Sequence, residues 1–187
     1  MTKDILDKLR LELSIKAKNG LDFTLAAGII WVMISFIWTL KTSPYNKSVF
    51  TFMVGALLLP LAFLFSKLFK TTWTIKDNPL QPLGLWLNFA QLFYFPFLVF
   101  ILIKSPDYFV MTYAIITGAH FFPYAWFYKT GWYATFAGII VMGALLLGLC
   151  LPNEKTYWVG CFTSISLFLI SACLYFDSAQ KLKLAKA

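Results

Sequence analysis

Long apolar stretches separated by short polar connections dominate the sequence. An α-helix needs about 20 apolar residues to cross the hydrocarbon core of a bilayer. Strands of a membrane barrel would instead show about ten residues of alternating polarity. The pattern therefore predicts an all-α fold, an integral membrane bundle of six transmembrane helices. The predicted spans are residues 21–40, 49–69, 83–103, 108–128, 132–151 and 157–176.

The connections between the spans carry residues that interrupt helices. The shortest connection is 129–131, where Gly131 follows Lys129 and Thr130 and predicts a tight reversal. Prolines also fall inside three of the predicted spans, where each removes a backbone hydrogen bond and predicts a kink. These prolines are Pro60, Pro96 and Pro123.

The first 20 residues differ from the spans, because charged residues alternate with an apolar stripe at helical spacing. A signal peptide would place its charges directly before an apolar core of about 7–15 residues. We expect instead an amphipathic helix on the inner membrane surface, or one that binds a partner protein. The domain organisation is thus the helix at 1–20, the six-helix domain at 21–176 and a basic tail at 177–187. The stripe consists of Ile5, Leu6, Leu9 and Leu13.

Composition narrows the class of protein. Hydrophobic residues make up 60% of the chain and charged residues 13%, against about 45–50% and about 25% in soluble domains. A water-soluble globule and a disordered chain are therefore excluded. The net charge of +8 does not indicate nucleic-acid binding, because the basic residues border the apolar spans.

The distribution of these basic residues predicts the orientation. Twelve of the sixteen Lys and Arg residues lie in the two tails, in the fourth connection, and in the second connection and at its border, all on one side of the bilayer. The positive-inside rule places that side, and both termini, in the cytoplasm. We expect a protein of the cell membrane whose partners are lipids with anionic headgroups; the sequence leaves a homodimer open.

Polar side chains inside hydrocarbon are costly and indicate function. In the third span two amides lie three residues apart on one helix face, followed by a tyrosine. In the fourth span polar residues recur at spacings of four, three and four. At about 1.5 Å per residue, Gln91 and His120 lie at the same depth, about 12 Å from the cytoplasmic side. The predicted ligand-binding residues, between these two spans, are Asn88, Gln91, Tyr94, Tyr113, Thr117, His120 and Tyr124.

Each of these polar groups also has a purely structural interpretation. His120 is the only histidine; it is either a proton acceptor in a cavity or an interhelical hydrogen-bonding group bound to Gln91, Tyr113 or a carbonyl. Asn88 and Gln91 also have two interpretations, as ligand contacts in a cavity or as amides that form hydrogen bonds between helices. Asp22 lies at the start of the first span, where the helix dipole favours a carboxylate; we prefer that role over one in a cavity.

No pattern indicates catalysis or a cofactor. Cys150, Cys161 and Cys173 lack metal-ligand spacing and are expected to be small buried thiols. Cys150 and Cys161 both fall near the outer face, so the sequence leaves a disulfide between them open. No phosphate-binding loop, catalytic triad or pair of carboxylates lies within a span. We expect no metal, no cofactor and no enzymatic activity, with a lipid-modifying enzyme as the least favoured alternative.

Two stretches repeat weakly at an offset of 88 residues, Gly55–Leu61 and Gly143–Leu149. Three helices in each half would give inverted repeats, which are common in transporters. Leucine-rich segments also match by chance, so both interpretations stay open.

Several stretches resemble a family of small bacterial multi-pass membrane proteins that is known only as a domain of unknown function. The resemblance covers nearly the whole chain and implies a bacterial membrane protein without implying an activity. Its motifs include the predicted polar cluster. The stretches are residues 12–16, 18–20, 76–80, 88–96 and 118–124.

Together these patterns predict a small-molecule or ion carrier or channel, with its site between the third and fourth spans and His120 as the protonatable group. The alternative is a membrane sensor or interaction subunit that transports nothing and acts through its tails and helix packing.

Overall fold

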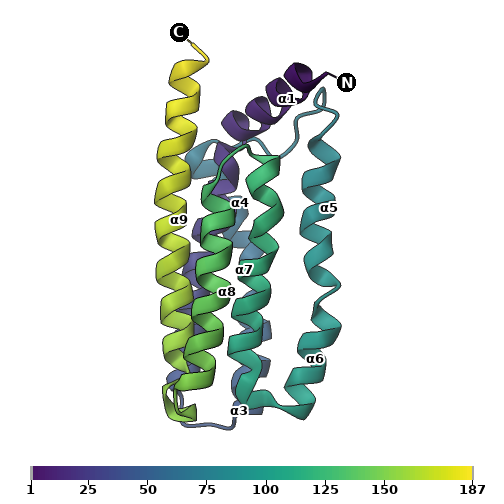
Figure 1. Ribbon diagram of the computed structural model, residues 1–187. Coiled ribbons are helices and arrows are strands. Elements are labelled where there is room, and N and C mark those ends of the chain that lie inside the picture. The colour runs from purple at the N-terminus through teal and green to yellow at the C-terminus, as the bar shows by residue number, and fades with distance from the viewer. Residues whose placement is uncertain (1, 187) are drawn as a thin grey trace.

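The computed structural model describes residues 2–186, so Met1 and Ala187, the outer ends of the predicted N-terminal helix and C-terminal tail, lie outside it. The described chain is an elongated bundle of helices without a strand (Figure 1). The all-α prediction is therefore confirmed for these residues.

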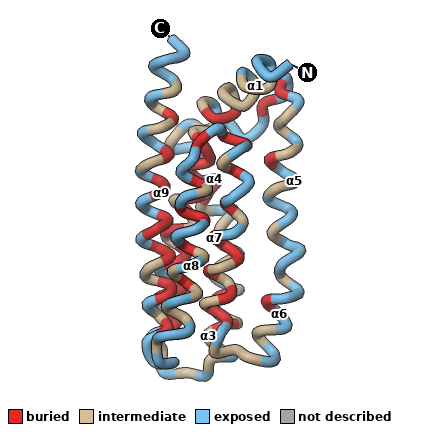
Figure 2. Tube along the Cα trace, viewed as in Figure 1, coloured by how far each residue is buried: buried red, intermediate tan, exposed pale blue. Residues whose placement is uncertain are grey.

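Four long helices form the densely packed part of the bundle. Buried residues concentrate between them (Figure 2). Glycines allow close approach: a Cβ at Gly160 would lie 2.5 Å from Ser35 Oγ, and one at Gly148 would lie 2.4 Å from Met111 Sδ. Such contacts are typical of helices that pack inside membranes. The helices are α2 (Leu21–Thr39), α7 (Phe109–Phe127), α8 (Trp132–Cys150) and α9 (Tyr157–Leu184).

Each of the two remaining predicted spans is divided into two helices. The second consists of α3 (Pro44–Gly55) and α4 (Leu58–Phe69), and the third of α5 (Gln81–Leu92) and α6 (Phe95–Lys104). Both breaks lie just before a proline, which lacks the N–H that would bond one turn back. The interruptions predicted from Pro60 and Pro96 are therefore confirmed, whereas α7 continues through Pro123.

Five helical segments are long and apolar enough to cross a membrane, one fewer than predicted. The fourth predicted span forms a helix, α7, but its Thr, Tyr, His and Pro residues dilute its hydropathy. The five segments are Lys18–Thr39, Pro44–Phe69, Gln81–Lys104, Trp132–Cys150 and Asn153–Leu184.

The outer faces of the divided spans are strongly apolar. Phe93 is 83% exposed, and Trp86 and Leu68 are each 68% exposed. Exposed apolar surface of this kind is unfavourable in water and favourable against lipid. The exposed helices thus support a membrane protein.

Helix α1 (Lys3–Lys16) crosses the end of the bundle at which both described chain ends lie (Figure 1). The predicted amphipathic helix is present, but it is docked on the bundle. Arg10 Nε donates to Trp126 O at 2.6 Å, and its guanidinium lies 4.5 Å from the Trp126 ring centroid. Bonds from Lys16 and Asn78 hold the pKa of Glu12 below its usual range.

Between α1 and α2 the chain makes a left-handed turn. Lys18, Asn19 and Gly20 have φ angles of 46°, 56° and 74°. The fully buried Asn19 donates from Nδ2 to Leu174 O at 3.1 Å and to Asp177 Oδ2 at 2.8 Å, and Tyr133 donates to Asn19 O at 2.6 Å. The Asn19 side chain thus joins the turn to α9, and the Asn19 backbone carbonyl joins the turn to α8.

The tight reversal predicted at residues 129–131 is confirmed. Lys129 adopts the left-handed φ of 52°, while Gly131 has an ordinary φ of −70°. The backbone N–H of Thr130 bonds to Ala125 O at 3.0 Å and closes the helix end.

At the chain's C-terminal end, α9 continues to Leu184, so most of the predicted tail is helical. The repeated stretches also differ, since the first spans the α3–α4 break and the second lies within α8. The three cysteines are free. Cys150 is exposed and Cys161 and Cys173 are half-buried, so the expectation that all three are buried is wrong.

The Asn19 contacts give a stability prediction. Asn19→Ala should lower the free energy of unfolding by about 3 kcal/mol, because it removes the buried side-chain hydrogen bonds that hold residue 19 in its left-handed conformation. Denaturant titration in mixed micelles measures the loss. The exposed Asn153 at the opposite end serves as the control, and equal losses for Asn153→Ala and Asn19→Ala would contradict the role of the turn.

Candidate ligand-binding cavity

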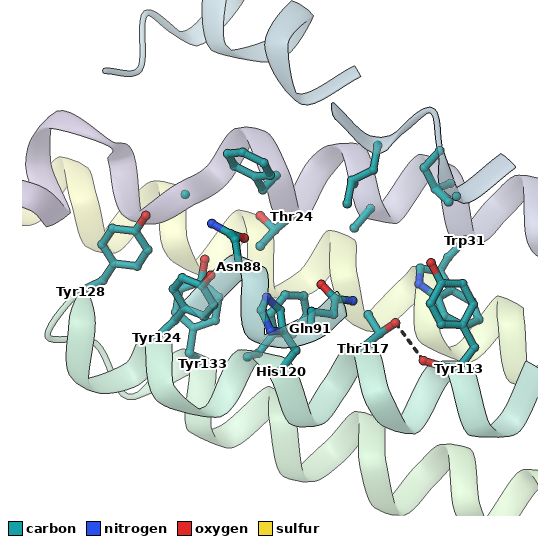
Figure 3. A pocket seen from close by; sticks show the side chains of 17 residues that line it. Thr24, Trp31, Asn88, Gln91, Tyr113, Thr117, His120, Tyr124, Tyr128 and Tyr133 are labelled. Carbon is teal, nitrogen blue, oxygen red and sulfur yellow. Dashed lines mark hydrogen bonds between the residues drawn. The ribbon is translucent and has the colours of Figure 1, made fainter. Parts of the chain in front are cut away.

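A cavity of about 100 Å³ lies within the bundle and is lined by residues of α2, α5, α7 and α8, together with Gly55 and Leu58 at the α3–α4 break. It is large enough for several waters or a small solute. Figure 3 shows the labelled side chains around it. Six of the seven predicted binding residues line it: Asn88, Gln91, Tyr113, Thr117, His120 and Tyr124.

The seventh predicted residue, Tyr94, does not line the cavity. It is 49% exposed and lies between α5 and α6. The prediction assumed a continuous helix, on which Tyr94 would share the face of Gln91. The break at Phe93 and Tyr94 ends that face, so Tyr94 is removed from the site.

Helix α5 brings its two amides to the cavity through a close contact with α7. A Cβ at Gly84 would lie 2.8 Å from Phe127 Cζ, so only glycine permits this approach. One turn later Asn88 Nδ2 donates to Gly84 O at 3.0 Å. Gln91, on the next turn, lines the cavity together with His120 of α7 (Figure 3).

Helix α7 supplies the opposite wall. Thr117 Oγ1 donates to Tyr113 O at 2.9 Å, a bond within the helix. The ring of His120 lies 5.3 Å from that of Tyr124 in an edge-on arrangement. Among residues 2–186, neither His120 nor Gln91 forms a side-chain hydrogen bond, so the bonds expected of interhelical hydrogen-bonding groups are not formed there.

The hydroxyl of Tyr124 is a buried polar group of the cavity wall without a hydrogen-bond partner in the described chain. Tyr124 is only 7% exposed. Tyr128 and Tyr133 lie beside it, with ring centroids 5.9 Å and 5.6 Å away. A buried hydroxyl without a partner is costly. A water or ligand in the cavity would satisfy it.

The sequence analysis missed the contribution of α2. Thr24 and Trp31 line the cavity two helical turns apart, and the Trp31 ring lies 5.4 Å from that of Tyr113. The spacing of seven residues was a visible signal, but only the third and fourth spans were paired.

A second cavity, of about 140 Å³, adjoins the first at the α1 end of the bundle. Leu13 and Ala17 of the N-terminal segment, and Trp73 of the α4–α5 connection, contribute to its wall. Five residues line both cavities, which makes them neighbours along one path: Gly20, Phe23, Asn88, Tyr124 and Tyr128.

Asp22 lines this second cavity and is only 1% exposed. Its Oδ2 accepts hydrogen bonds from Thr71 Oγ1 at 2.6 Å and Trp73 Nε1 at 2.5 Å. Asp22 lies in the first turn of α2, as the helix-dipole interpretation requires. That interpretation did not foresee its burial or its place in a cavity wall.

Metal binding has no support in the described residues, since no three His, Cys, Asp or Glu side chains among positions 2–186 lie close enough to hold an ion.

Comparison with known sequences gives the family. A family model described as a family of unknown function (DUF7010) matches residues 6–177, and the chain belongs to this family. The expectation of an uncharacterised family is confirmed, while bacterial origin stays a prediction. No curated protein and no solved structure matches the chain.

Two tyrosines of the wall give a matched test of the unpartnered hydroxyl. Tyr133→Phe should lower the free energy of unfolding by about 1–2 kcal/mol, because the bond to Asn19 O is lost. Tyr124→Phe should leave it unchanged or raise it, since no bond is lost. Thermal unfolding of both variants in one detergent measures the difference. A loss for Tyr124→Phe equal to that for Tyr133→Phe would show that the Tyr124 hydroxyl has a partner.

Proposed function

We propose that this DUF7010 protein crosses the cell membrane six times and acts as a carrier or channel for a small polar solute or ion. The observation that carries this proposal is the path of two adjoining cavities. Tyr124 lines both of them, and its buried hydroxyl has no hydrogen-bond partner within the described chain. Gln91 and His120 line the first cavity, and their side chains form no hydrogen bond among residues 2–186. The path runs from the α1 end into the middle of the bundle.

Six crossings require α7 to span the membrane together with the five more apolar segments. Six crossings place both chain ends on one side, and both lie at the same end of the bundle (Figure 1). The excess of Lys and Arg at that end supports a cytoplasmic location. Helix α1 then lies at the inner interface, next to anionic headgroups.

The helix breaks support movement at the site. Gly55 and Leu58 flank one break and line the first cavity, and Gln91 lies just before the other break. Interrupted helices at mid-membrane binding sites are typical of secondary transporters. In the proposed mechanism α3 and α6, the halves of the two spans that lie away from α1, pivot at these breaks and open the cavity on the side opposite α1. No catalytic step and no cofactor is part of this proposal.

The docking of α1 favours a second candidate, a sensor or interaction subunit. Ile5 and Lys8 are exposed on α1, whereas Leu13 is buried. Deleting residues 1–18 would therefore disturb the fold, so a double variant Ile5→Ser and Lys8→Ser tests this role more cleanly. It should abolish activity if α1 binds a partner, while His120→Ala should be tolerated.

For the carrier we expect the opposite result. In vesicles that hold the purified protein, His120→Ala should reduce the flux of protons or small cations at least about tenfold, the scale of one lost interaction with a charged group. The α1 double variant should retain the flux of the unaltered protein. Absence of flux under every imposed gradient would contradict transport.

Water access gives the first test of the path. In a background without Cys150, Cys161 and Cys173, a cysteine at position 91 or 120 should react quickly with a membrane-impermeant thiol reagent from the cytoplasmic side. Phe93→Cys is the matched control, because this residue faces outward and is 83% exposed.

Intact and inverted vesicles distinguish the two sides. A cysteine at position 93 should resist labelling in both, since lipid covers it. No labelling at positions 91 and 120 from either side would contradict the hydrated path. Fast labelling at position 93 would contradict the placement of α5 against lipid.

A further inference from the structure

We infer that the second cavity binds a small organic cation, an alkylammonium or quaternary ammonium group, with Asp22 as its counter-charge and aromatic rings as its wall. This inference rests on the proposed function and names the class of solute. It concerns binding at the α1 end of the path, which is measurable without transport.

The unpaired charge of Asp22 carries the first part of the argument. Its carboxylate is almost completely buried and accepts hydrogen bonds from three neutral donors, the Thr71 hydroxyl, the Trp73 indole N–H and the Phe23 backbone N–H. A buried carboxylate without a cation is costly, and neutral hydrogen bonds offset only part of that cost. The ion pairs within residues 2–186 do not include Asp22: Asp7–Arg10, Glu12–Lys16, Asp7–Lys129 and Asp177–Lys181.

The aromatic wall carries the second part. The rings of Phe23 and Trp73 lie 4.9 Å apart, and the bond from Trp73 Nε1 to Asp22 fixes the indole beside the carboxylate. Phe127 and Tyr128 add further rings to the same cavity. Aromatic faces attract ammonium groups, and tryptophan does so most strongly. A carboxylate beside such faces matches an organic cation.

The same wall disfavours an inorganic ion. Ca²⁺ takes six to eight oxygen ligands, and Mg²⁺ requires an octahedral set. The wall offers a single carboxylate and three other polar side chains, Thr72, Gln81 and Asn88, and the Gln81 oxygen already accepts from the Ile75 backbone N–H. The remaining side chains are apolar or aromatic, so the wall does not supply the oxygen set of a divalent ion. An alkylammonium group needs no such ligand set.

The position of Tyr124 extends the specificity. This residue lines both cavities, and its hydroxyl has no partner within the described chain. A ligand with its cationic group near Asp22 and a hydroxyl or carbonyl group a few bonds away would satisfy it. The expected solute is thus a short amine with a second polar group.

Calorimetry on the purified full chain in lipid nanodiscs tests the inference. The probes are tetramethylammonium, ethylammonium and choline, together with the neutral isostere of choline in which a carbon replaces nitrogen. At least one cation should bind, and choline should bind about tenfold or more tightly than its isostere, because the cation–π and ionic attractions are lost without the charge. Binding of no cation, or equal binding of choline and isostere, would overturn the inference.

Variants locate the binding. Asp22→Asn keeps an oxygen that accepts from Trp73 and Thr71 but removes the charge, so cation affinity should fall about tenfold or more. Asp107→Asn makes the same change at the opposite end and should leave affinity unchanged. Trp73→Phe keeps an aromatic face and should weaken binding by a smaller factor than Asp22→Asn. If Asp22→Asn does not fold, Trp73→Phe still tests whether the cation binds in this cavity.

Unchanged affinity in a folded Asp22→Asn variant, or in Trp73→Phe where the first does not fold, would overturn the inference. The outcomes also separate it from the proposed function. Cation binding without flux in vesicles would refute transport and leave the site intact. Flux of another solute without cation binding would refute the site and leave transport intact.

Discussion

The left-handed turn at residues 18–20 fixes where α2 begins, and the position of both cavities depends on it. Three consecutive positive φ angles are unfavourable for residues other than glycine, and the buried bonds of Asn19 compensate for them. Lys181 adds to the same network, donating to Ser14 Oγ and to Tyr128 O at 3.0 Å each. The turn thereby sets the rotation of α2, and with it the direction in which Asp22 and Thr24 point.

The cavities lie at the boundary between two differently packed halves of the bundle. On one side α2, α7, α8 and α9 interlock through glycine contacts that leave no room for a larger side chain. On the other side lie two spans, one formed by α3 and α4 and the other by α5 and α6. Each span is interrupted near its middle and exposes large apolar residues (Figure 2). A tightly packed half next to a segmented half permits relative motion along their boundary, which is where an alternating-access site is expected.

Apolar length predicted five of the six spans, because crossing hydrocarbon is a local demand on each helix, whereas the fourth span, α7, forms a helix of lower hydropathy. Helical spacing brought most of the polar cluster together correctly, but it failed for Tyr94, since one-face spacing holds only while the helix is continuous. Prolines marked two breaks, whereas α7 continues through Pro123. The contacts of Asn19 and Asp22 could not be predicted in this way, because their partners lie far away in sequence, at Leu174 for Asn19 and at Thr71 and Trp73 for Asp22.

Helix α1 has a role in both the transport hypothesis and the interaction hypothesis. Its buried face supplies Leu13, and the residue after it, Ala17, also lines the second cavity, while Lys16 O accepts from the Thr72 backbone N–H at 2.9 Å. Displacing α1 would therefore open the cavity near Asp22 whether a partner or the bilayer moves it. A change on the buried face alters both functions together. Only changes on the exposed face separate a helix that recruits a partner from one that closes a binding site.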